Sequence, residues 1–371
     1  MLTNRRNFLK TSSGAIATTA LLSMGSSRLL GHNGDHPSGS IIGHGDRKYR
    51  VNNAWGNLNP NQFPIINCHA MVESESGRLY TLTDVKANNI IVYEPDGTFV
   101  ESMDLEYSGG HGIDIAKEGD EEFLYIADGG WANRYGRKVS NETGRIAKTD
   151  LKGRLVFTIG HPQTIGVYKP GQSFKPCDIA VAPNGDIYVA DGYGSQCVLH
   201  YDKHGQYINH WGGKDDPVEA RRLNGSHGVS VDLRKPDSPI LLVASREANR
   251  IKRFTMDGDY IDEFYLPGAF AGQLLVQGDH AYTGVCWSKK DNEGGRLPKS
   301  GFVIVLDKDN QVVSCPGGEA PVYKDGVLQP LNQAPNAPFK HVHDLCVDRE
   351  ENIYVCQWNA GGAYPIKLEL V

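Results

Sequence analysis

The sequence predicts an all-β fold, a six-bladed β-propeller with four-stranded antiparallel blades. Glycine and proline, 43 and 19 of the 371 residues, lie between short apolar runs, a pattern typical of many strands joined by turns. The chain also contains an internal repeat, since one unit of two strands around a turn occurs six times, about every 55 residues. A β-sandwich, the main alternative, would not contain six homologous units.

The repeated unit is clearest at 175–191, KPCDIAVAPNGDIYVAD, where a Pro-Asn-Gly-Asp turn separates two strands. A second copy, HVHDLCVDREENIYVCQ at 341–357, aligns with it without a gap. The remaining four units are 67–84, 109–128, 225–245 and 272–284. Each unit therefore supplies the first two strands of one blade.

Two more strands around a second turn follow each unit, as in IIVYEPDGTFVESM at 90–103. The Asp-Gly pair in this turn readily takes the positive φ that tight hairpins require. A further strand, KYRVNNAWG at 48–56, precedes the first unit, and the chain ends in YPIKLELV. We expect these two end strands to share the last blade and close the ring.

The first 30 residues are typical of a targeting segment. Paired arginines, Arg5 and Arg6, precede a weakly apolar stretch, which resembles a twin-arginine export signal. We expect residues 1–30 to engage the twin-arginine translocase and direct the chain to the periplasm or another extracytoplasmic site. An uncleaved signal would anchor the protein in the membrane. A polar linker, 31–47, would then precede the propeller at 48–371.

The charge balance argues against polyanionic partners. A formal net charge of −6 argues against nucleic acid and anionic lipid, because both require a basic face. We therefore expect a small-molecule or peptide substrate in the central channel. The seven cysteines include no C-x-x-C pair, so they predict no zinc ribbon. In an exported protein Cys346 and Cys356 could form a disulfide across a hairpin, but buried thiols are an equal alternative.

Three histidines begin the first strand of alternate units. His111, His227 and His343 are each separated from the next by 116 residues. The homologous residues of the other units are Cys68, Cys177 and Gly272. Because the first strand of each blade lines the channel, the three imidazoles should converge with near three-fold geometry. This geometry suits Zn²⁺ with an open fourth position, although iron, manganese or cobalt could also bind three histidines.

Together these segments resemble NHL-repeat propellers, and among them the peptidyl-α-hydroxyglycine α-amidating lyases. The resemblance covers approximately residues 65–360. Its most specific segments are HGIDI (111–115), KPCDIAVAPNGDIYVADGY (175–193), NGSHGVSVD (224–232), LLVASREANRIKRF (241–254) and HDLCVD (343–348). The resemblance implies that His111, His227 and His343 bind the catalytic zinc.

The same resemblance implies further site residues. The tyrosine of an Asp-Gly-Tyr turn corresponds to Tyr193, and an active-site arginine corresponds to Arg246. A structural calcium on the axis would take a carboxylate from Asp344 and a backbone carbonyl from Ile113. Alternatively, Tyr193 could be a packing residue at a blade corner, and Arg246 could form a surface ion pair with its neighbour Glu247.

The implied reaction is cleavage of an N–C bond in a hydroxylated substrate. In that family a peptide ending in α-hydroxyglycine loses a hydroxyl proton and collapses to a peptide amide and glyoxylate. Tyr193 would act as the base, and Arg246 would hold a carboxylate or stabilise developing charge. We therefore expect an exported, metal-dependent, lyase-like enzyme.

Three positions depart from the family pattern. Asp84 stands where the family has a second active-site arginine, and Lys86, two residues on, is no bidentate clamp. Phe174 and Gly194 replace two cysteines that flank the Asp-Gly-Tyr turn. We therefore expect an intact metal site with altered substrate recognition.

Two other functions stay open. The protein could be a non-catalytic NHL-propeller binding module for a protein or glycan, which a fourth protein ligand closing the metal site would favour. It could instead be a calcium-dependent, lactonase-like hydrolase. Such sites use Glu, Asn and Asp around the axis, so three histidines count against this alternative.

Overall fold

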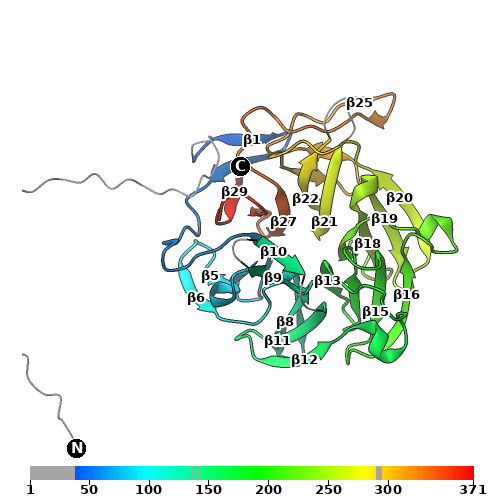
Figure 1. Cartoon of the computed structure of the whole chain (residues 1–371). Coiled ribbons are helices and arrows are strands. Elements are labelled where there is room, and N and C mark those ends of the chain that lie inside the picture. The colour runs from blue at the N-terminus through cyan, green and yellow to red at the C-terminus, as the bar shows by residue number, and fades with distance from the viewer. Residues whose placement is uncertain (1–37, 135–136, 141–142, 290–294) are drawn as a thin grey trace, which may run out of the picture. The chain divides into compact units, whose positions relative to one another are not determined.

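The computed structural model describes residues 38–371 except 135–136, 141–142 and 290–294, and it confirms the six-bladed propeller (Figure 1). The predicted export signal, 1–30, lies outside the described residues. In the described part of the chain the helices are four 3-10 turns: η1 (Lys86–Asn88), η2 (Pro162–Ile165), η3 (Glu219–Arg221) and η4 (Arg246–Ala248). None of these helices is long or apolar enough to cross a membrane.

The first five blades follow the chain order, and each is a four-stranded antiparallel sheet. Blade 1 contains β3 (Cys68–Glu73), β4 (Leu79–Thr83), β5 (Ile90–Tyr93) and β6 (Phe99–Met103). Blade 2 contains β7 (Gly110–Glu118), β8 (Glu121–Asp128), β11 (Arg145–Asp150) and β12 (Leu155–Ile159). Blade 3 contains β13 (Asp178–Val181), β14 (Ile187–Ala190), β15 (Cys197–Tyr201) and β16 (Tyr207–Gly212).

Blades 4 and 5 repeat this arrangement. Blade 4 contains β17 (Ser226–Asp232), β18 (Ile240–Ser245), β19 (Arg250–Thr255) and β20 (Tyr260–Tyr265). Blade 5 contains β21 (Ala269–Gln277), β22 (His280–Ser288), β23 (Phe302–Leu306) and β24 (Val312–Ser314). Two short hairpins lie outside the blades: β9 (Trp131–Arg134) with β10 (Arg137–Ser140), and β25 (Tyr323–Lys324) with β26 (Val327–Leu328).

Blade 6 joins the two ends of the propeller. It consists of β27 (Val342–Val347), β28 (Ile353–Gln357), β29 (Ile366–Leu370), β2 (Arg47–Asn52) and β1 (Ile41–His44). The pairing of Val51 with Leu368 confirms the predicted closure of the ring. The strand β1 corrects the described part of the predicted linker, 38–47, because this hairpin strand extends the last blade. The rest of that segment, 31–37, lies outside the described residues. Its Ile42 packs against the apolar cluster of blades 5 and 6, a contact that the polar composition of the segment concealed.

The core consists of apolar layers between neighbouring blades. One such layer joins Tyr125 and Ala127 of blade 2 to Ile187 and Val189 of blade 3, all fully buried. Because both faces of a blade are covered, a central strand of the blade can be a continuous apolar run rather than an alternating one, as in β23, FVIVL. Each fully buried aliphatic side chain contributes roughly 1.5–3 kcal/mol to the free energy of unfolding.

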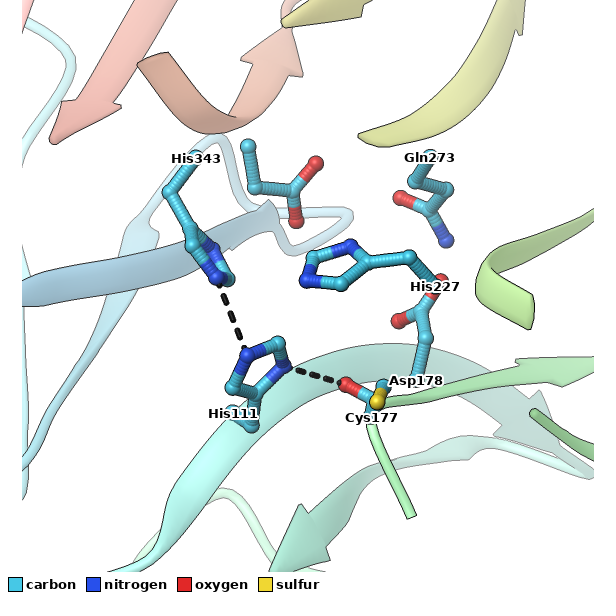
Figure 2. Close-up of a pocket in the computed structure, with 7 residues that line it drawn as sticks. His111, Cys177, Asp178, His227, Gln273 and His343 are labelled. Carbon is cyan, nitrogen blue, oxygen red and sulfur yellow. Dashed lines mark hydrogen bonds between the residues drawn. The ribbon is translucent and has the colours of Figure 1, made fainter. Parts of the chain in front are cut away.

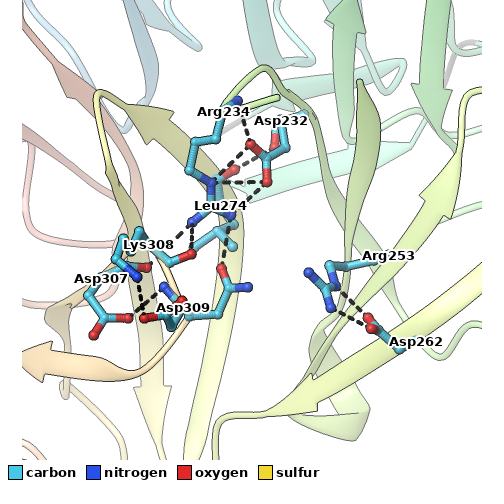
Figure 3. A network of polar contacts seen from close by, with 10 residues as sticks. Asp232, Arg234, Arg253, Asp262, Leu274, Asp307, Lys308 and Asp309 are labelled. Carbon is cyan, nitrogen blue, oxygen red and sulfur yellow. Dashed lines mark hydrogen bonds and ion pairs between the residues drawn. The ribbon is translucent and has the colours of Figure 1, made fainter. Parts of the chain in front are cut away.

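Polar contacts also tie adjacent blades together, as Figure 3 shows for blades 4 and 5. Arg234, in the loop after β17, pairs with Asp232 at 2.6 Å and donates to Asn310 Oδ1 of blade 5 at 2.9 Å. By contrast, Arg253 and Asp262 pair within blade 4. The Arg234 contact holds the loop ends of the two blades in register.

The cysteines are buried thiols. All seven are free and buried, so the alternative of a disulfide between Cys346 and Cys356 is wrong. The register of β27 with β28 explains this result, because it places Cys346 opposite Tyr354 and Cys356 opposite Asp344.

Candidate metal centre

The first strand of five blades contains a bulge near its start, and in four of them, all except β21, the bulge skips a histidine. In β7, for example, Gly110 pairs with Asp128 and Gly112 with Ala127, which leaves His111 outside the ladder. The strands β3, β17 and β27 have the same irregularity. The four skipped residues are His69, His111, His227 and His343. A bulge redirects the side chain that it skips, so four blades share one local device for positioning an imidazole.

In blade 1 the skipped residue is His69, whereas the comparison of the sequence repeats placed Cys68 at the homologous position. Cys68 pairs with Thr83 in the ladder and packs in the core, whereas His69 is the skipped residue. The prediction was one residue too early. Ala70 pairs with Leu82 as Gly112 pairs with Ala127 in blade 2, so the residue before Ala70, His69, corresponds to His111. One available signal was a histidine followed by a small residue, which occurs in CHA (68–70), GHG (110–112) and SHG (226–228).

The four imidazoles lie close together in the interior, and each residue is at most 5% exposed. Figure 2 shows the rings of His111, His227 and His343 facing a common point. Ligand atoms of His69, His111 and His343 all lie within 4.8 Å of one another. The ring centroid of His227 lies 4.9 Å from that of His111 and 5.1 Å from that of His343. Two nitrogens bound to one tetrahedral zinc lie about 3.4 Å apart, so this cluster is of the right size for an ion.

Hydrogen bonds to backbone carbonyls indicate which nitrogen of two rings faces the cluster. His111 Nδ1 lies 2.7 Å from Cys177 O, and His343 Nδ1 lies 2.8 Å from His69 O. A carbonyl can only accept, so Nδ1 carries the proton and Nε2 keeps its lone pair. The two Nε2 atoms are 3.0 Å apart. Two lone pairs at this distance require a proton or a metal cation between them, and the residues therefore fit a metal ion.

The third predicted ligand, His227, is also suited to the neutral state. Burial lowers the pKa of His227 well below its ordinary value, and the positive charge of Arg246 lowers it further. A neutral imidazole is the form that binds a metal. His227 Nε2 lies 3.2 Å from the hydroxyl of Tyr193, which places the predicted base at the edge of the histidine cluster.

Tyr193 lies in a turn that follows β14. The turn is held by the buried Asp191, which accepts hydrogen bonds from Lys175 N at 2.6 Å and Ser195 N at 2.7 Å. A Cβ at Gly194 would lie 2.2 Å from Asp191 Oδ1, which explains the departure from cysteine there. Phe174, the other departure, is a buried core residue.

Asp191 should therefore make the stability of the protein depend on pH. Burial raises its pKa to about 7, well above 3.8, so between these values the folded state holds a proton that the unfolded state lacks. Its contribution to stability is complete below about pH 4 and is lost as the pH rises through 7. Between pH 5 and 7.5 the wild-type protein should lose about 2 kcal/mol of unfolding free energy through Asp191, and Asp191→Asn should not show this loss.

Urea unfolding at the two pH values measures this difference. Asp202→Asn in the same blade is a matched control, because this partly exposed turn aspartate has a pKa below its ordinary value. The prediction is contradicted if Asp191→Asn has the same pH dependence as the wild-type protein.

The environment of Tyr193 combines a phenol with a buried cation. Tyr193 is 41% exposed, but its hydroxyl faces the buried histidines. Burial raises the pKa of the phenol to about 12, and the charge of Arg246 opposes this rise. The guanidinium carbon of Arg246 lies 5.7 Å from the centroid of the Tyr193 ring. A metal cation next to the phenol would lower its pKa further.

Arg246 begins η4 and is only 4% exposed. Its Nε lies 3.3 Å from Glu247 Oε1, so the predicted alternative of an ion pair is present, although it is not at the surface. Its Nη1 is buried and has no hydrogen-bond partner among the described residues. A buried guanidinium with an unused donor is suited to binding a carboxylate.

Asp84 and Lys86 occupy different environments. Asp84 is 2% exposed and accepts hydrogen bonds from Asn67 N at 3.0 Å and Asn67 Nδ2 at 2.6 Å. Its Oδ2 lies 3.8 Å from His69 Nε2. Burial alone would raise the pKa of Asp84, but His69 and Asn67 together lower it to about 2. Lys86 pairs with Glu106 at the surface, so it does not replace the missing arginine.

A second layer of polar side chains lies against the histidines. The lining of a cavity of about 10 Å³, enough for one water molecule or ion, includes Asp344 as well as Asp178 and Gln273, which Figure 2 labels. Burial raises the pKa of Asp344 and of Asp178, and the charge of Asp344 raises that of Asp178 further. Asp344 Oδ1 has no hydrogen-bond partner among the described residues. Ile113 packs its side chain into the core, which leaves its main chain as the only part that could bind calcium.

Comparisons with known proteins agree with this fold. A family model for the NHL repeat matches residues 175–201. The chain is 26% identical over 238 residues to peptidyl-α-hydroxyglycine α-amidating lyase 1 of Drosophila melanogaster, covering 56% of this chain and 37% of that protein. It is 26% identical over 213 residues to human (Homo sapiens) NHL repeat-containing protein 3, covering 56% and 57%. Each match thus spans less than two thirds of the relative.

Solved structures show the same architecture. A gluconolactonase from Xanthomonas campestris superposes with a TM-score of 0.56 at 14% identity, covering 91% of this chain and 100% of that one. At this identity the likeness concerns the fold alone. The blades, the NHL repeat and the sequence matches agree: the chain is a six-bladed β-propeller that contains an NHL repeat and resembles the peptidyl-α-hydroxyglycine α-amidating lyases.

Proposed function

We propose that this protein is a metal-dependent lyase, with zinc as the ion, that cleaves an N–C bond of a hydroxylated substrate. The observation that carries the proposal is the placement of Tyr193. Its hydroxyl lies 3.2 Å from His227 Nε2, and the buried Arg246 lies beside its ring. A base, a carboxylate-binding cation and a cluster of neutral imidazoles therefore meet at one point. The resemblance to an amidating lyase supports the same chemistry.

In the proposed reaction each site residue has a distinct role. His111, His227 and His343 would hold the ion, which when bound supplies the Lewis acidity that lowers the pKa of a substrate hydroxyl. Arg246 would bind a substrate carboxylate through its unused Nη1 donor. Tyr193, as the phenolate, would accept the hydroxyl proton. The C–O bond then becomes a carbonyl, the C–N bond breaks, and the nitrogen leaves with its electron pair and takes up a proton, which Tyr193 can return.

The test is the release of glyoxylate from a peptide ending in α-hydroxyglycine. We expect release by zinc-loaded protein, loss after treatment with a chelator, and recovery when zinc is added back. Metal analysis of the same samples should show about one ion per chain. Protein that binds zinc but releases no glyoxylate would contradict this substrate, and protein that binds no transition metal would contradict the metal-dependent lyase.

One observation favours a second function, a non-catalytic binding module. The ligand atoms that lie within 4.8 Å of one another belong to His69, His111 and His343, and His227 is a fourth imidazole next to them. Four tetrahedral ligands would leave no position for a substrate. In that case the protein would bind zinc but release no glyoxylate, and replacing Tyr193 would change neither result.

We also propose a calcium ion next to Asp344 and the main chain of Ile113. The unpartnered Oδ1 of Asp344 and the neighbouring Asp178 support this proposal, because two buried carboxylates repel each other without a cation. We expect calcium to raise the Tm of the wild-type protein by a few degrees over an EGTA-treated sample. Asp344→Asn should abolish the difference. An equal Tm with calcium and with EGTA in the wild-type protein would contradict the site.

The export signal predicted at 1–30 completes the proposal. A chain that crosses the membrane folded, through the twin-arginine translocase, could acquire its ions before export and act in the periplasm. Fractionation of cells that express the wild-type chain, beside a variant in which Arg5 and Arg6 are both replaced by lysine, would test this location.

A further inference from the structure

The cluster contains one imidazole more than a three-histidine site requires. His69 lies on the first blade, between the blades that carry His111 and His343. Its ring centroid is 5.1 Å from that of His111 and 4.8 Å from that of His343. These separations resemble those of His227 from the same two rings, which are 4.9 and 5.1 Å. His69 therefore belongs to the cluster as closely as the ligand that the sequence predicts.

The backbone of blade 1 is built in the same way as that of the other histidine blades. The bulge in β3 skips His69 just as the bulges in β7, β17 and β27 skip the other three histidines. The bulge in β21 of blade 5 skips Gly272 and Gln273, so the bulge shapes the position and the residue type decides whether it carries a metal donor. The bulge in β3 thus turns a donor toward the axis.

A carboxylate lies directly behind His69. Asp84 Oδ2 is 3.8 Å from His69 Nε2, and the two side chains are 0% and 1% exposed. Both oxygens of Asp84 are held by Asn67, which fixes the carboxylate in place. Metal-binding histidines commonly have such a carboxylate behind them, which orients the ring and increases its basicity.

The charge of Asp84 also favours a cation nearby. A buried carboxylate is costly unless a positive charge compensates it, and Asn67 is neutral. Lys86, the nearest cation in sequence, pairs with Glu106 at the surface instead. His69 is the residue next to Asp84, with 3.8 Å between Nε2 and Oδ2. With an ion bound, a neutral His69 placed between the ion and Asp84 satisfies both charges.

We propose that His69 is a fourth imidazole ligand of the ion bound by His111, His227 and His343, and that Asp84 is the positioning residue that orients it. This inference rests on the proposed metal site but not on the proposed reaction. Together with the proposed reaction it implies a coordination number above four, because a substrate would then need a fifth position that faces Tyr193. Iron, cobalt and zinc can all take such a coordination number.

The test uses Co²⁺ as a spectroscopic probe in the full-length protein. The visible absorption of Co²⁺ is strong in tetrahedral sites and weak at higher coordination numbers. We expect weak bands in the wild-type protein, and stronger tetrahedral bands in His69→Gln. Competition with a chelator should show affinity for Co²⁺ at least about 100-fold lower in His69→Gln and about 10- to 100-fold lower in Asp84→Asn.

His200→Gln is the matched control. His200 is 3% exposed, and its Nε2 lies 3.0 Å from Asp186 Oδ2, so it is another buried histidine–aspartate pair, located in blade 3 away from the cluster. This variant should keep the wild-type spectrum and affinity. If His69→Gln does not fold, Asp84→Asn still tests the proposal, because it keeps the imidazole.

The outcomes separate this inference from the proposed function. A spectrum and an affinity that are unchanged within about twofold in His69→Gln would overturn the fourth ligand and leave a three-histidine site. Strong tetrahedral bands in the wild-type protein would overturn the open fifth position. A wild-type protein that binds neither Co²⁺ nor Zn²⁺ would instead refute the proposed metal-dependent function.

Discussion

His111→Ala should abolish both metal binding and activity. His111 is 3.0 Å from His343 through their Nε2 atoms, and it belongs to the predicted three-histidine set as well as to the set with His69. Loss of an outer residue behind a ligand typically weakens metal binding 10- to 100-fold, so loss of a direct ligand should exceed about 100-fold. Elemental analysis after dialysis should find about one ion per wild-type chain and almost none in the variant, with glyoxylate release reduced at least as strongly.

The control for this prediction is His200→Ala, which removes a buried histidine outside the cluster and should keep the metal. Circular dichroism and the Tm establish that both variants are folded. A folded His111→Ala protein that retains wild-type metal content would contradict the whole cluster, whatever its activity.

Tyr193→Phe should separate catalysis from metal binding. The substitution removes one hydroxyl, which contacts His227 Nε2 at 3.2 Å, and keeps the ring beside Arg246. If Tyr193 is the base, kcat/KM should fall about 10²- to 10⁴-fold with unchanged metal content. Because the phenolate is the active form and burial raises the pKa of the phenol to about 12, the wild-type rate should increase with pH on its acid side.

The variant should lose this pH dependence together with its activity. Tyr265→Phe, at an exposed tyrosine on β20, is the matched control and should behave as the wild-type protein. A Tyr193→Phe protein within threefold of the wild-type kcat/KM would assign Tyr193 to packing, the alternative that its sequence position left open.

Most of the fold could be predicted because its information is local. A strand, a turn with glycine or asparagine and a second strand recur six times, and neither packing nor distance is needed to see them. The closure of the ring through β2 and β29 also followed from two end strands that lacked partners. The added strand β1 did not, because its residues are mostly polar or glycine and its stabilising contact, that of Ile42 with blades 5 and 6, is long-range.

The site was predictable where it follows the repeat. His111, His227 and His343 stand at equal spacing, and the structure brings them to one point together with Tyr193. His69 was missed because the last apolar position of β3 comes one residue earlier than in blade 2: Val72 corresponds to Asp114, and Glu73 to Ile115. The residue count alone therefore selected Cys68, a core residue, in its place.

The sequence by itself determined the number of blades, their order and the equal spacing of His111, His227 and His343, since strand and turn propensities act over a few residues. Only the tertiary structure decided which side chains share the axis. It placed Asp84 behind His69, turned Lys86 away to Glu106 and buried Arg246 next to Tyr193. Such contacts depend on the exact register of bulges and on the closure of a ring, which join residues far apart in the chain and have no local signature.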